Sequence, residues 1–173
     1  MTASAPPLSY HSAGTSMPDT STASAAGMTV LEGVLDEESA PVLAALSKAL
    51  ATAPSIELDV GGLRRINSLG VRAWVDFVRS LGERPVTFRR CSPSFVDQLN
   101  TVSDFRGGAR VASFLAPYVC ETSGNAFYEE LIVGKDVSPG NFAGFDRRPC
   151  KECPEPLVFD DLPERYFQFL SFD

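Results

Sequence analysis

Residues 56–60 alternate between apolar and acidic side chains, in the order Ile-Glu-Leu-Asp-Val. This period of two predicts a strand with one buried face, and Gly61 and Gly62 are expected to end it. The period then changes to that of a helix, with Asn67 or Ser68 as its N-cap. The apolar positions that predict this helix are Val71, Trp74, Val75, Val78 and Leu81. We expect Trp74 to be a core residue.

The same patterns predict strands and helices in alternation on both sides of this segment. The predicted strands are Met28–Leu35, Val86–Arg90 and Val111–Leu115, and the predicted helices begin near Ser39 and Ser92. Such an order indicates an α/β fold in which helices pack on a mixed, largely parallel β-sheet. We assign this domain to residues 27–115.

Residues 1–26 are rich in Ser, Thr, Ala and Pro and carry few large apolar side chains. A segment of this composition buries too little surface to offset the entropy lost on ordering. We therefore predict a disordered tail, whose deletion should leave stability nearly unchanged. His11, the single histidine, lies in this tail and is expected to be solvated rather than catalytic or metal-bound.

The net charge of −7 disfavours broad binding to nucleic acid or to anionic membranes, because both require a basic face. No apolar run is long enough to span a bilayer, so membrane insertion is not expected. The N-terminus also lacks the pattern of a secretory signal. Four cysteines do not resemble a disulfide framework, and we expect a cytoplasmic protein with reduced thiols.

Residues 116–173 differ in character and predict a small β-rich appendage packed on the α/β domain. Cys120 lies beside one turn, and Cys150 and Cys153, with two residues between them, lie in a second turn. This outline resembles a zinc ribbon, in which two cysteine-bearing turns face each other. The first turn is incomplete, since Ser123 stands where a second cysteine is expected.

The resemblance implies structural zinc held by Cys120, Cys150 and Cys153, with Asp146, water or Ser123 in the fourth position. A degenerate ribbon without metal and a redox pair are the alternatives. Cys91 ends a predicted strand and is expected to be a buried core residue. The aromatic C-terminus is expected to pack back on the protein rather than to anchor a partner. It comprises Tyr166, Phe167, Phe169, Leu170 and Phe172.

Two stretches, residues 55–82 and 86–105, resemble the STAS domain, the module of bacterial anti-sigma factor antagonists. In that family a strand leads into an Asp-Ser-Ser-Gly motif that opens a helix. The matching residues here are Asn67, Ser68, Leu69 and Gly70. The second stretch is similar to the family's next strand, Ser-Pro turn and short helix. The family pattern usually has more strand at the front and a final helix behind.

The resemblance implies a STAS-like fold and a protein partner, commonly an anti-sigma factor with kinase activity. It also implies a partner-binding loop formed by Asn67, Ser68, Leu69, Gly70 and, on the helix, Arg72. In the family, phosphorylation of the hydroxyl residue before the glycine controls binding. That position is Leu69 here, and Asn67 replaces the family's Asp.

We therefore expect a non-enzymatic bacterial signalling or scaffold protein that lacks the usual phosphoswitch. One alternative is an antagonist controlled by phosphorylation of Ser68, the neighbouring hydroxyl residue. Another is a metal- or thiol-dependent enzyme centred on Cys120, Cys150 and Cys153.

Overall fold

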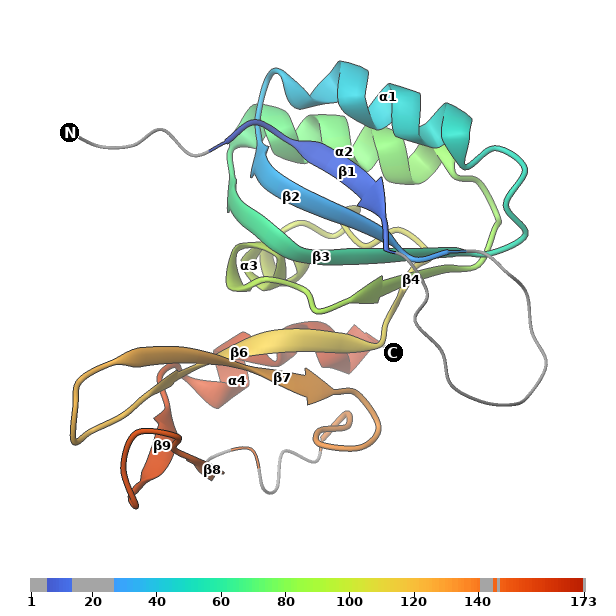
Figure 1. Ribbon diagram of the computed structural model, residues 1–173. Coiled ribbons are helices and arrows are strands. Elements are labelled where there is room, and N and C mark those ends of the chain that lie inside the picture. Colours follow the sequence, from blue (N-terminus) through green and yellow to red (C-terminus); the bar gives the residue numbers. More distant parts are fainter. Residues whose placement is uncertain (1–5, 14–26, 141–144, 146, 173) are drawn as a thin grey trace.

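The structure is a computed structural model that describes residues 6–13, 27–140, 145 and 147–172 (Figure 1). It has a five-stranded sheet in the order β1-β2-β3-β4-β5 and a four-stranded sheet in the order β7-β6-β9-β8. The first sheet comprises β1 (Ser9–Ser12), β2 (Thr29–Leu35), β3 (Ile56–Ile66), β4 (Val86–Arg89) and β5 (Arg110–Val111). The second comprises β6 (Ser113–Val119), β7 (Ala126–Ile132), β8 (Arg147–Pro149) and β9 (Pro156–Phe159).

Three helices cover the first sheet and confirm the α/β class. They are α1 (Ser39–Ala49), α2 (Ser68–Ser80) and α3 (Pro93–Thr101). Figure 1 shows α1 and α2 together on one face and α3 on the opposite face, between the two sheets. A short helix α4 (Pro163–Tyr166) and a 3₁₀ helix (Gln168–Phe172) follow the second sheet. No helix in the described part of the chain has the length and apolar character needed to cross a membrane.

The predicted disorder of residues 1–26 is wrong for residues 6–13, while residues 14–26 lie outside the described residues. β1 pairs antiparallel with β2, and the Leu8 side chain is buried. Gly33 lies so close to the preceding segment that a Cβ on it would be 2.2 Å from the Pro7 carbonyl oxygen. The amino-acid composition of residues 1–26 did not indicate this strand, because one buried leucine and backbone hydrogen bonds are enough to order it. His11 is exposed on β1.

Deletion of residues 1–13 is expected to lower the free energy of unfolding by about 2–3 kcal/mol, because burying one leucine side chain contributes about that much. This replaces the expectation of an unchanged stability. For a chain of this size, the melting temperature should fall by roughly 4–12 °C. Thermal unfolding followed by circular dichroism measures the change. Leu8→Ala in the full chain is the milder companion variant, and an unchanged melting temperature in the deletion would show that β1 contributes nothing.

The predicted end of the central strand at Gly61 and Gly62 is also wrong, because β3 continues to Ile66. The glycines are instead places where neighbouring chain segments approach closely. A Cβ on Gly62 would lie 2.6 Å from Glu32 Cγ and 2.9 Å from the Leu31 carbonyl oxygen. The pairing of β2 with β3 shifts register at this point, which is typical of a β-bulge.

The two sheets share one hydrophobic core rather than forming separate units. The boundary expected between residues 115 and 116 falls inside β6. A parallel bridge joins Cys91 to Phe114, and the Leu115 N–H donates to the Cys91 carbonyl at 2.9 Å. The Phe114 ring packs against the rings of Tyr166, Phe167 and Phe169. The C-terminal segment therefore closes the core over β6.

Candidate functional site

The residues of the predicted loop, Asn67 to Gly70, form the N-cap and the first turn of α2, and this start of the helix is held at the C-terminal end of β2. The Asn67 N–H donates to the Leu35 carbonyl at 3.0 Å. The Asn67 side chain caps α2, because its Oδ1 accepts from the Gly70 N–H at 2.8 Å. Its Nδ2 donates to Glu37 Oε2 at 3.0 Å. Backbone and side-chain bonds thus fix both ends of the loop.

Gly70 is the residue that lets α2 begin against β2. A Cβ at this position would lie 2.0 Å from the Leu35 carbonyl oxygen and 2.7 Å from the Asp36 nitrogen. No side chain fits at these distances, and the neighbouring atoms belong to the backbone. The glycine that matches the family motif is therefore required by packing alone.

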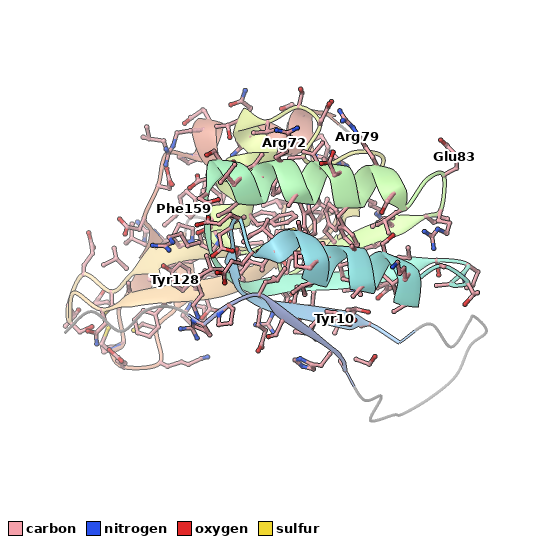
Figure 2. All side chains as sticks on the ribbon, turned by 90° about the horizontal axis from the view of Figure 1, so that it is seen from above. Tyr10, Arg72, Arg79, Glu83, Tyr128 and Phe159 are labelled. Carbon is pink, nitrogen blue, oxygen red and sulfur yellow. The ribbon has the colours of Figure 1, made fainter. Side chains whose placement is uncertain are left out.

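Leu69 is presented to solvent by this rigid frame. Its side chain is 54% exposed, and it is one of few large apolar residues with that exposure among the described residues. Ser68 and Arg72 beside it are exposed as well. Figure 2 shows Arg72 pointing outward from α2. The arrangement is an exposed apolar residue with polar neighbours on the first turns of a helix.

The cap at this helix belongs to Asn67, so Ser68 does not serve as the N-cap. Ser68 is the first residue of α2, and its side chain is exposed. Glu37 contributes an acidic group to the same end of the helix. The Glu37 backbone N–H and the Asn67 amide lower the pKa of this carboxyl group. A phosphate added on Ser68 would therefore meet helix N–H groups but also a nearby carboxylate.

The three cysteines of the predicted ribbon come together at the second sheet. Cys120 directly follows β6, while Cys150 and Cys153 lie in the turn between β8 and β9. The three Sγ atoms all lie within 4.8 Å of one another. The Sγ atoms of Cys120 and Cys153 are 3.4 Å apart. These residues could hold a metal ion, because thiolates are preferred ligands of zinc and of other soft metals.

Hydrogen bonds from the two turns reach the sulfur atoms. The Ser123 N–H lies 3.4 Å from Cys120 Sγ, and the Glu152 N–H lies 3.4 Å from Cys150 Sγ. The Ser123 hydroxyl, followed by its N–H, lowers the pKa of Cys120 to about 6. The hydrogen bond with Cys120 raises the pKa of Cys153. The lowered pKa favours the thiolate of Cys120, the form in which cysteine binds metals.

Polar side chains join the two turns beside the cysteines. The Ser123 hydroxyl donates to Glu152 Oε2 at 3.1 Å, and Asn125 Nδ2 donates to the same oxygen at 2.9 Å. The sequence alone does not indicate Asn125 and Glu152 as site residues, because nothing in either turn shows which residues of the other turn lie opposite. Asp146, considered as a fourth ligand, lies outside the described residues.

Two further expectations about individual residues are confirmed. Cys91 is completely buried, and this burial raises the pKa of its thiol, so it is a core residue. The C-terminal aromatic side chains pack back on the protein instead of standing exposed. This holds for Tyr166, Phe167, Phe169 and Leu170, whereas the side chain of Phe172 lies outside the described part.

No family model, curated protein or solved structure matches this chain.

Proposed function

We propose that this chain is a non-enzymatic bacterial signalling protein that binds a protein partner through Leu69 and the first turns of α2. The observation that carries the proposal is the exposed Leu69 side chain in the first turn of α2, whose start is fixed by the Asn67 cap. Apolar residues that are rigid before binding lose little entropy when a partner covers them. Arg72 adds a charge that can select an acidic partner surface.

The arrangement of elements supports a STAS-like assignment. β3 followed by α2, and β4 followed by α3, coincide with the two stretches that resemble the family. β1 adds a strand at the front, where the family pattern has one. An anti-sigma factor of the kinase type is the partner class that this assignment suggests, in the cytoplasm.

Replacing Leu69 with glutamate is expected to abolish partner binding without loss of fold, because the exposed side chain contributes little to the core. Tagged chains would be compared in pull-downs from the native cell. Leu162→Glu is the matched control, since Leu162 is 66% exposed and lies outside the loop. A specific partner should be retained by wild type and by the control but lost by Leu69→Glu. Equal retention by all three chains would contradict the proposed surface.

Binding is proposed to occur without the usual phosphoswitch, since Leu69 occupies the acceptor position. Ser68→Ala and Ser68→Asp should then retain the same partner to the same extent. Intact mass measurement should also show the native chain without phosphate. Stoichiometric phosphate on Ser68, together with loss of the partner in Ser68→Asp, would favour the phosphorylation-controlled antagonist instead.

We further propose that Cys120, Cys150 and Cys153 hold zinc, which ties the β6–β7 turn to the β8–β9 turn. The closeness of the three Sγ atoms supports this role. Protein purified without chelator should contain stoichiometric zinc by elemental analysis, and Cys150→Ser should lose it. Zinc at background in the wild type would leave a ribbon held by its apolar residues.

A further inference from the structure

The cysteine centre supplies three ligands, whereas tetrahedral zinc takes four. Closed structural sites take all four ligands from the protein, and sites with three protein ligands leave one position to an outside molecule. Ser123 stands three residues after Cys120, as Cys153 stands three residues after Cys150. Its hydroxyl is thus the first candidate for the fourth ligand.

The Ser123 hydroxyl is already engaged in other interactions. Its oxygen accepts from the Asn125 N–H at 3.3 Å, and its proton is donated to Glu152 Oε2 at 3.1 Å. A neutral hydroxyl is also not among the usual ligands of zinc. A metal would have to displace these bonds to gain a weak ligand.

The Glu152 carboxylate does not complete the site either. Its Oε2 is held by Ser123 and Asn125 on the opposite turn. Among the described residues, the cluster of possible metal ligands contains the three cysteines and not Glu152. The ligand atoms of this cluster all lie within 4.8 Å of one another. Glu152 therefore acts as a link between the turns rather than as a fourth ligand.

An outside ligand can reach the centre. Ser123 and Glu152 are exposed, and Cys150 and Cys153 are half-buried. Cys120 is buried, so a ligand from solvent would approach from the side of Cys150 and Cys153.

The charge of the centre selects the kind of ligand. Zinc with three thiolates carries one excess negative charge, and the turns add Glu121, Glu152 and Glu155 against Lys151. Another anion would be repelled there, whereas a neutral nitrogen donor would not. Imidazole is the neutral donor that zinc prefers. The single histidine of this chain, His11, lies on β1 of the other sheet.

We propose that the three-thiolate centre keeps an open fourth coordination position that takes an imidazole from outside the chain. This inference rests on the proposed metal site and goes beyond a purely structural role. A histidine side chain of a partner protein is the natural source of such a ligand. The second sheet would then contribute a metal-dependent contact, separate from the surface around Leu69.

The test uses the full chain with Co²⁺ in place of zinc, because the visible bands of cobalt report its ligands. Free imidazole is the probe. In the wild type, the cobalt bands should shift with increasing imidazole and the shift should saturate. Ser123→Ala should also show a saturable shift with imidazole, because the hydroxyl is not a ligand. Ser123→Cys should give a four-thiolate spectrum that does not respond.

Cobalt bands that do not change with imidazole would overturn the open position while leaving the metal site intact. Loss of cobalt from the protein at the imidazole concentrations used would overturn it as well. A saturable response to imidazole in Ser123→Ala but not in the wild type would show that the hydroxyl is the fourth ligand. Failure of the wild type to bind either zinc or cobalt would overturn both this inference and the proposed metal site.

Discussion

Replacing Trp74 with alanine is expected to lower the free energy of unfolding by about 3–5 kcal/mol, the usual cost of removing a buried aromatic side chain. Trp74 is fully buried on α2, and its ring lies 5.1 Å from that of Phe95. Its Nε1 donates to the Phe105 carbonyl at 2.9 Å, and the variant would remove that hydrogen bond. Further rings packed on it are Phe77 and Phe88.

Because domains are stable by about 5–15 kcal/mol, this loss could remove most of the stability. Urea unfolding followed by circular dichroism measures it, since Trp74 is the single tryptophan and fluorescence is lost with it. Trp74→Phe is the control, because it keeps an aromatic ring but removes the hydrogen bond. Its loss should be smaller than that of alanine. A loss below about 1 kcal/mol in Trp74→Ala would contradict a central role for this ring.

The helices of the first sheet were the most predictable part of the fold. The apolar positions of α2 recur at helical spacing, and Asn67 caps its first turn. In α3, Ser92 accepts from the Phe95 N–H at 3.2 Å, and Pro93 occupies the first turn. Both signals lie within the helix and its cap, so they can be identified in the sequence whatever packs on the helix.

The strands that were missed depend on contacts distant in sequence. β1 is ordered by β2, about twenty residues further along, and its own composition resembles that of a disordered segment. The extension of β3 through Gly61 and Gly62 depends on how closely β2 and the segment after β4 approach it. A glycine pair signals a turn as readily as a close approach, so pattern alone could not distinguish them.

The candidate sites show the same difference between features encoded locally and features that depend on distant contacts. The spacing of Cys150 and Cys153 predicted one turn of the ribbon, and the structure places Cys120 beside it. The bonds from Ser123 and Asn125 to Glu152 join two hairpins, and no local pattern encodes which side chains meet there. The hydrogen bonds of the Ser123 hydroxyl, on which the proposed open position depends, could therefore not be inferred from sequence.

Replacing Gly70 with alanine is expected to lower the free energy of unfolding by about 1–3 kcal/mol, the usual cost of overpacking. Helix propensity alone predicts the opposite sign, since alanine is favoured over glycine by about 1 kcal/mol inside a helix. The destabilisation from overpacking should exceed the gain in helix propensity, because the new Cβ would lie 2.0 Å from the Leu35 carbonyl oxygen. The start of α2 would have to move away from β2. That movement breaks the hydrogen bond from the Asn67 N–H to Leu35 and displaces Leu69.

Gly108→Ala is the matched control, because no atom lies within 4 Å of a Cβ built there. Urea unfolding should separate the two variants, with Gly108→Ala close to the wild type. At low denaturant, where Gly70→Ala is still folded, its partner binding should also be weaker, because the loop no longer holds Leu69 in one place. A stabilised Gly70→Ala would show that α2 and β2 are not in close contact. A destabilised variant with unchanged binding would show that the rigidity of the loop is not what the partner requires.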